Sequence, residues 1–261
     1  MKIGAMNHPA RDVVSEIRWM AEMKLDFIDL TLEPPAACTG VIDVAAVKRA
    51  LDDSGLGIVG HTAYYLPFCS PFKALRRGAT EEFKRCIEIF GELGSKWVNV
   101  HPDRHAPFHD RAFMIEMNLE CFTQVMPSAK AAGVGIMIEN LPGHYNTPAE
   151  VGWFLDRMPE LGMHLDIGHA NLMVERNTTP DLCAAYGKRL AHVHAHDNKG
   201  GSGDLHLPIG AGHIDWPSMI RALKGANYND TITLEVFSED RHFLAYSRDR
   251  LRVLWDETVS A

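Results

Sequence analysis

The sequence lacks the features that mark secreted and membrane-spanning proteins. No segment approaches the roughly 20 consecutive apolar residues that a membrane helix requires, and residues 1–8 contain no apolar stretch long enough for a signal peptide. Cysteine is scarce, odd in number and without a Cys-x-x-Cys pair, which argues against a disulfide framework and a thiolate zinc site. The five cysteines are Cys38, Cys69, Cys86, Cys121 and Cys183. We therefore expect a cytoplasmic protein with no membrane partner.

Positive charge is also in short supply. The chain has 26 Lys and Arg against 34 Asp and Glu, for a net charge of −8. A surface of this sign repels polyanions as a whole, which disfavours nucleic acid as a partner. Histidine, in contrast, is abundant at 14 residues. Histidine in this number, beside carboxylates, favours a metal-binding function.

Six short apolar runs each end on a residue that can bind a metal. Each run is bounded by Gly, Pro or polar residues and is too short for a helix, which predicts a buried strand. The residues that end the runs are His61, His101, Glu139, Asp166, His194 and Glu235. Ligand-type side chains at the same end of successive strands indicate one site where parallel strands converge.

Strand-like runs alternate with amphipathic helical segments along the whole chain. Further strands are expected at residues 2–6 and 27–32, and helices at 13–23, 44–51, 81–93, around 119–126, from 148, at 181–186, after Trp216 and at 243–255. Eight such units in 261 residues predict an α/β fold, a single (β/α)8 TIM barrel forming one domain over residues 1–261. A doubly wound open sheet is the alternative.

The alternation of side chains along the strands favours the barrel over the open sheet. If the strand-final ligands point inward, Asp29, Asn99, His164, His192 and Thr233 share that inner face. Their neighbours on the same strands are apolar and would face the helices. A polar interior with an apolar outer wall suits a barrel that has a charged site at its mouth, whereas an open sheet would be apolar on both faces.

Four of the strand-final residues form the predicted core of the site. Glu139, Asp166, His194 and Glu235 end strands five to eight, at the C-terminal face where barrel active sites lie. Their oxygen and nitrogen donors suit Mn, Zn, Co, Fe or Mg, and we expect Zn or Mn. Three carboxylates in one dry site would repel each other unless a cation were bound.

Further ligands and substrate contacts are predicted around this core. His61 and His101 would hold a second metal with Glu139 bridging, and His169, Asp204 and His206 a third, so that one to three ions are expected per chain. The predicted substrate-binding residues are Glu33, Tyr64 and Lys199. His164 and His192, deeper in their strands, are interpreted as hydrogen-bonded core histidines, and Trp216 as the anchor of the helix that follows it.

Several of these segments resemble the xylose-isomerase-like barrel superfamily, which contains sugar phosphate isomerases and epimerases and is related to the zinc-dependent apurinic-site endonucleases. Together with His61, these segments span residues His61 to Phe237. The segments are Asn99-Val100-His101-Pro102, Ile138-Glu139-Asn140, Leu165-Asp166-Ile167-Gly168-His169, His192-Val193-His194-Ala195-His196-Asp197-Asn198, residues 204–216 and Leu234-Glu235-Val236-Phe237.

The resemblance implies two different reactions. All nine positions similar to the trinuclear ligands of the endonuclease branch are filled, and Tyr64 also suits that branch. Residues 207–216 instead look like the sugar isomerase and epimerase group, and residues 200–216 contain no Lys or Arg for phosphate contacts.

The favoured hypothesis is a metal-dependent isomerase or epimerase of a small sugar, sugar phosphate or related polyol. Proton transfer would take place at a metal-chelated hydroxycarbonyl, with Glu139 and Glu235 as catalytic base and acid. The alternative is a multinuclear metal-dependent phosphodiester hydrolase resembling apurinic-site endonuclease. The sequence leaves a homo-oligomer open.

Overall fold

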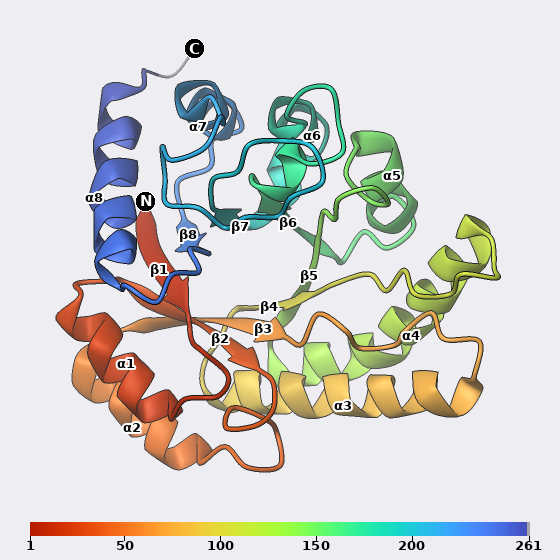
Figure 1. The fold of residues 1–261 in the computed structure, drawn as a ribbon. Coiled ribbons are helices and arrows are strands. Elements are labelled where there is room, and N and C mark those ends of the chain that lie inside the picture. The colour runs from red at the N-terminus through yellow and green to blue at the C-terminus, as the bar shows by residue number, and fades with distance from the viewer. Residues whose placement is uncertain (260–261) are drawn as a thin grey trace. The chain divides into compact units, whose positions relative to one another are not determined.

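The computed structural model describes residues 1–259. Within them, eight parallel strands follow the order β1 to β8 in a closed barrel, and α-helices alternate with the strands (Figure 1). The predicted (β/α)8 TIM barrel is confirmed, and the open doubly wound sheet is wrong. None of the helices in residues 1–259 combines the length and the apolar character needed to cross a membrane.

The bounds of the elements agree closely with the alternation in the sequence. The strands are β1 (Lys2–Met6), β2 (Phe27–Leu32), β3 (Gly57–Thr62), β4 (Trp97–Val100), β5 (Gly135–Glu139), β6 (Gly162–Asp166), β7 (Leu190–Ala195) and β8 (Thr231–Leu234). The helices are α1 (Val13–Glu22), α2 (Val44–Ser54), α3 (Lys73–Glu92), α4 (Arg111–Ala132), α5 (Pro148–Leu155), α6 (Thr179–Tyr186), α7 (Trp216–Gly225) and α8 (His242–Glu257).

Contacts divide the chain into two compact units. The first contains Met1–Ala5, Glu139–Gly152 and the chain from Gly162 onward; the second contains Met6–Ile138 and Trp153–Leu161. The prediction of one domain over residues 1–261 stays a prediction.

In the first unit, β6, β7 and β8 place polar side chains side by side. His164 pairs with His192 and Asp166 with His194, while His194 pairs with Thr233 on β8. These five side chains are buried, and the intervening Leu165 and Val193 are fully buried apolar residues. The alternation predicted from the sequence therefore holds in this unit.

In the second unit, β2, β3 and β4 repeat the same arrangement. Thr31 pairs with His61, and His61 pairs with Asn99. The helices α3 and α4 pack side by side (Figure 1). Helix α3 begins eight residues before the expected residue 81. The sequence pattern does not predict these first turns, because residues 73–80 are largely polar or small and show no apolar periodicity.

Side-chain caps explain where several helices begin. Asp12, Asp43, Asp110 and Asp215 each accept a hydrogen bond from the backbone N–H three residues later. Such a cap satisfies one of the backbone donors that a helix start leaves without a partner. At α5, Glu150 accepts from the Thr147 backbone at 3.1 Å, as the capping-box pattern predicts.

Candidate metal centre

The four predicted core ligands meet in the first unit. Glu139 and Asp166 are the last residues of β5 and β6, His194 lies one residue before the end of β7, and Glu235 directly follows β8. One donor atom each from Glu139, Asp166 and His194 lies within 4.8 Å of the others. His194 Nδ1 donates to Glu235 Oε2 at 3.1 Å. The structure brings these side chains together, and their role as ligands stays a prediction.

Asp166 is held as an anion at the centre of this group. Burial by itself would raise the pKa of its carboxyl group, but His169 and His196 hold that pKa well below its usual range. Its backbone is fixed by Asn140, whose Oδ1 accepts from the Asp166 N–H at 2.8 Å and whose Nδ2 donates to the Asp166 carbonyl at 3.0 Å. The carboxylate is therefore charged and fixed in place before any ligand arrives.

The donor set fits a divalent cation. Glu139, Asp166 and Glu235 are 1%, 0% and 9% exposed, so three carboxylates share a nearly dry site. Among the described residues, Oδ2 of Asp166 has no hydrogen-bond partner. A buried carboxylate oxygen without a donor is costly unless a cation compensates it.

A second group of potential ligands surrounds Asp204. Its Oδ2 lies 3.2 Å from Nε2 of His169 and 3.2 Å from Nε2 of His206. In both histidines Nδ1 donates to a backbone carbonyl, that of Asn140 at 3.1 Å and that of Glu235 at 3.0 Å. This is how metal-binding histidines are usually oriented, with the other nitrogen directed at the ion. The three residues predicted for a third metal are therefore neighbours.

Charge couples these side chains. Burial would lower the pKa of His206, but its hydrogen bond to Asp204 and the nearby Glu235 raise that pKa to about 9. His169 and His206 lower the pKa of Asp204, although burial by itself would raise it. A cation at these nitrogens would therefore compete with protons.

The raised pKa of His206 predicts a pH dependence of stability for protein treated with a chelator. The ordinary histidine pKa is about 6.5 and the folded value about 9. The folded state binds the extra proton between these values, so the stabilisation is complete below about pH 6.5 and is lost as pH rises through about 9. Thermal denaturation should show a melting temperature that falls more steeply from pH 6.5 to 9.5 in wild type than in His206→Gln. Parallel curves would show that the His206–Asp204 contact does not stabilise the fold.

His196 belongs to the site, although the sequence analysis assigned it no role. It is fully buried, its Nε2 lies 3.2 Å from Asp166 Oδ1, and its ring stacks on His206 at 4.1 Å between centroids. Gly168 makes room for it, because a Cβ at that position would lie 2.1 Å from the His196 ring. The signal for His196 was its position two residues after His194, which places both on one side of an extended chain.

Asp197 holds the two ends of the loop after β7 together through hydrogen bonds. Asp197 and Leu207 exchange two backbone hydrogen bonds of 2.9 and 2.8 Å. The carboxylate accepts from Gly210 N–H at 2.9 Å and from the indole N–H of Trp216 at 2.9 Å. Trp216 begins α7, so the prediction that it anchors this helix is confirmed. The predicted substrate contact Lys199 is an exposed residue of this loop.

The remaining predicted residues lie in the second unit. His61 and His101 pack edge to face with ring centroids 5.0 Å apart, and Nε2 of His61 is 2.9 Å from the Asn99 side chain. Glu33 accepts a hydrogen bond from Tyr65, whose pKa is raised by burial and by this carboxylate. Tyr64 is 63% exposed and packs against Tyr65.

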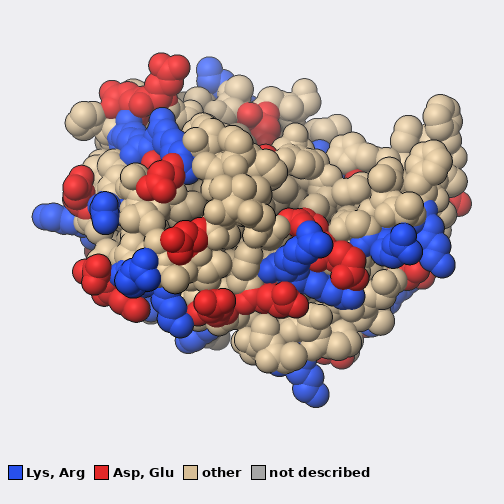
Figure 2. Space-filling model, turned by 90° about the horizontal axis from the view of Figure 1, so that it is seen from below, with Lys and Arg blue, Asp and Glu red and all other residues tan. Residues whose placement is uncertain are grey.

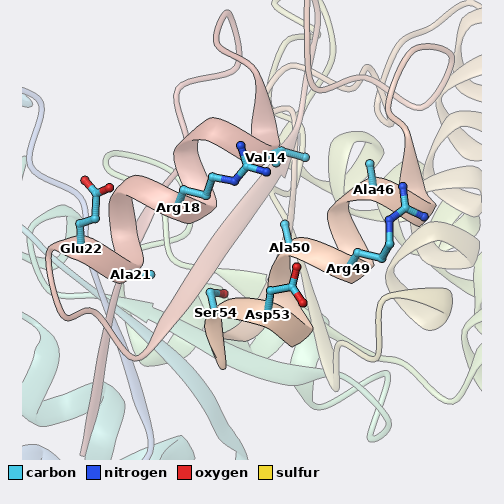
Figure 3. Close-up of a pocket in the computed structure, with 9 residues that line it drawn as sticks. All are labelled: Val14, Arg18, Ala21, Glu22, Ala46, Arg49, Ala50, Asp53 and Ser54. Atoms are coloured by element: carbon cyan, nitrogen blue, oxygen red, sulfur yellow. The ribbon is translucent and has the colours of Figure 1, made fainter.

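A separate pocket in the second unit lies between α1 and α2 (Figure 3). Its apolar lining comes from small residues such as Ala21 and Ala50, and its charged residues are Arg18, Arg49, Glu22 and Asp53. The two positive and two negative side chains balance each other, and all four are exposed. We assign no function to this pocket.

Surface charge also bears on the kind of partner. Figure 2 shows Lys and Arg interspersed with Asp and Glu over the face that it presents. Together with the net charge of −8, this mixture differs from the concentrated basic surface typical of nucleic-acid-binding proteins.

The curated proteins that are similar to this chain include two epimerases and one probable endonuclease. An L-ribulose 3-epimerase of Methylomonas sp. (strain DH-1) is 35% identical over 36% of this chain and 31% of its own length. A ketose 3-epimerase of Arthrobacter globiformis is 22% identical over 90% of this chain and 80% of its own. A probable endonuclease 4 of Haloarcula marismortui is 26% identical over 78% and 79%. The chain thus spans from under a third to about four fifths of these relatives.

Solved structures share the fold. A D-tagatose 3-epimerase-like protein superposes with a TM-score of 0.83 at 24% identity, covering 98% of this chain and 97% of that protein. The family model described as xylose isomerase-like TIM barrel matches residues 17–255, which is most of the chain. The chain therefore belongs to the xylose isomerase-like TIM barrel family.

Proposed function

We propose that this protein is a metal-dependent isomerase or epimerase of a small sugar, sugar phosphate or related polyol. The observation that carries the proposal is the buried group of Glu139, Asp166, His194 and Glu235, which combines a cation-binding donor set with two glutamates. The names of the curated relatives favour ketoses among the candidate substrates. We expect the protein to act in the cytoplasm, alone or as a homo-oligomer.

The four core residues would hold the cation, with zinc or manganese as the expected metals. When bound, the ion would supply positive charge beside a carbonyl oxygen and its neighbouring hydroxyl, which makes the adjacent C–H bond more acidic. His61 and His101, and His169 with Asp204 and His206, are the proposed positions of further ions. Glu33, Tyr64 and Lys199 are the proposed contacts to the rest of the substrate.

The two glutamates would carry out the proton transfers. Glu139 would accept the proton from carbon, and Glu235 would donate a proton on the other face of the substrate. Glu139 is almost fully buried, which keeps bulk water away from the carboxylate that would take up the proton. Nδ1 of His169 lies 3.0 Å from Glu139 Oε1, and Nδ1 of His194 contacts Glu235 Oε2. Each glutamate therefore has one oxygen next to an imidazole that can hold its orientation.

Elemental analysis and a substrate panel test the proposal together. Purified protein should contain a stoichiometric divalent metal and should convert at least one ketose or ketose phosphate into its epimer or isomer in deuterated water, with deuterium incorporated at the reacting carbon. Chelation should abolish turnover, and the same metal should restore it. Active metal-loaded protein that exchanges no carbon-bound hydrogen with any sugar would contradict the proposal.

A second candidate function is phosphodiester hydrolysis. The neighbouring pair His61 and His101 and the group around Asp204 favour it, because a multinuclear hydrolase needs ligands beyond the core four. The acidic net charge weighs against a DNA substrate. Cleavage of an abasic duplex in the same panel, with three metals per chain, would favour this candidate over the epimerase.

A further inference from the structure

Two buried histidines on β6 and β7 lie just before the strand residues that form the candidate metal centre. His164 and His192 precede Asp166 and His194 by two residues and pair with each other in register. Neither is more than 1% exposed, and their ring centroids are 5.0 Å apart. Similar position and burial make them a matched pair, but their contacts differ.

His192 is bound by the neighbouring strand. Its Nδ1 is 2.8 Å from the Thr231 hydroxyl, and its Nε2 is 2.9 Å from the Thr233 hydroxyl. Both nitrogens therefore have hydrogen-bond partners on β8. These contacts support the interpretation of His192 as a core histidine that stabilises the strand pairing.

His164 is directed at the site instead. Its Nδ1 lies 3.3 Å from Oε2 of Glu139, and its ring packs edge to face on His194 with centroids 4.0 Å apart. The other oxygen of Glu139 is 3.0 Å from His169 Nδ1. Each carboxylate oxygen of Glu139 thus faces a different imidazole, and the His164 ring contacts both the proposed base Glu139 and the proposed metal ligand His194.

Packing alone does not explain a histidine at this position. Met163 and Leu165, on either side of His164, are fully buried apolar residues on the opposite face of β6, whereas the His164 side chain lies beside polar groups on His194 and Glu139. A hydrocarbon would remove the imidazole nitrogen that lies 3.3 Å from Glu139 Oε2, although a catalytic carboxylate has to be held to within about 0.5 Å. Contacts of this kind are often long in the absence of substrate and shorten in the reacting complex.

We propose that His164 is a positioning residue that fixes the Glu139 carboxylate and the His194 ring in the orientation that the reaction and the cation require. The catalytic part of this inference rests on the proposed isomerase or epimerase function. The part that concerns the cation does not depend on it.

Three substitutions at His164 separate positioning from packing. His164→Asn keeps a nitrogen donor near the place of Nδ1, His164→Gln moves it toward the place of Nε2, and His164→Leu removes it. On a ketose that wild type converts, kcat should fall about 10- to 100-fold in the Gln and Leu variants, with KM within about threefold, as for other residues that orient a metal site. The Asn variant should stay within about threefold of wild type. His192→Asn, the matched control, should lower the melting temperature but leave kcat unchanged.

Titration with Co²⁺ gives a readout that needs no turnover. The visible absorption of the bound ion reports ligand geometry, so His164→Gln and His164→Leu should shift the bands or weaken binding, while His164→Asn and His192→Asn should match wild type. If wild type converts no sugar but this pattern holds, the proposed function fails and the assignment of His164 stands. Equal effects of Asn, Gln and Leu, or a wild-type spectrum in the Leu variant, would overturn the assignment.

Discussion

At saturating concentrations of the cation, Glu139→Gln and Glu235→Gln should each lower kcat by about 10³-fold. Glutamine preserves the shape of the side chain and one carbonyl oxygen for the ion, but it cannot accept or return a proton. General acid–base catalysis typically contributes 10²- to 10⁴-fold, which sets the scale of the expected loss. Steady-state kinetics, with metal content measured on the same preparations, gives both quantities.

The control for these two variants is the same substitution at a glutamate outside the site. Glu116 is exposed and pairs with Arg157 at 2.6 Å, so Glu116→Gln should keep wild-type kcat and metal content. Deuterium exchange at the substrate carbon separates the two roles, because loss of the base should stop proton removal itself. Wild-type rates in both site variants, with metal bound, would remove Glu139 and Glu235 from the mechanism.

Asp166→Asn should weaken binding of the divalent cation by at least about 100-fold, more than is usual for loss of a residue that only supports a ligand. The amide can still accept the His169 backbone N–H that now donates to Oδ1 at 2.8 Å, so the turn after β6 should survive. What is lost is the negative charge that His169 and His196 stabilise by lowering the pKa of Asp166. Isothermal titration with Zn²⁺ or Mn²⁺ measures the affinity directly.

The same variant makes a prediction for stability. Because His169 and His196 keep the pKa of Asp166 low in the folded state, the charged carboxylate stabilises the fold at neutral pH, and chelator-treated Asp166→Asn should melt below the wild-type temperature. Added metal should raise the melting temperature of wild type but hardly that of the variant, because ligand stabilisation follows affinity. Asp181→Asn on α6 is the control, because it removes a surface ion pair with Arg176, which precedes that helix. Undiminished metal binding by Asp166→Asn would exclude Asp166 as a ligand.

The fold could be predicted from the sequence because its signals are local. Short β-type runs such as Ile136–Glu139 contrast with helical segments in the spacing of apolar residues, and eight such units indicate a barrel. The start of α3 was missed because Lys73 and the turns after it carry no apolar stripe, so only the later turns had a signal.

Only the part of the site that lies at the ends of neighbouring strands could be predicted from the sequence. Asp166 ends β6 and His194 lies one residue before the end of β7, and parallel pairing places these two residues side by side. Asp204 approaches His169 through a loop whose path depends on Asp197, and no periodicity encodes that path. His196 was missed because its meaning depends on Gly168, whose missing side chain leaves the space that the imidazole fills.

The backbone hydrogen bonds between Asp197 and Leu207 affect how the length and sequence of this loop can vary during evolution. Since the two ends of residues 198–206 are already joined by a pair of backbone hydrogen bonds, adding or removing residues between them costs little, as loop-closure entropy grows slowly with length. The exposed glycine-rich stretch around Gly201 could be lengthened or rewritten while α7 and the barrel strands keep their positions. Selection for a new substrate, in nature or in the laboratory, can therefore act on this loop while the neighbouring helix and strands stay unchanged.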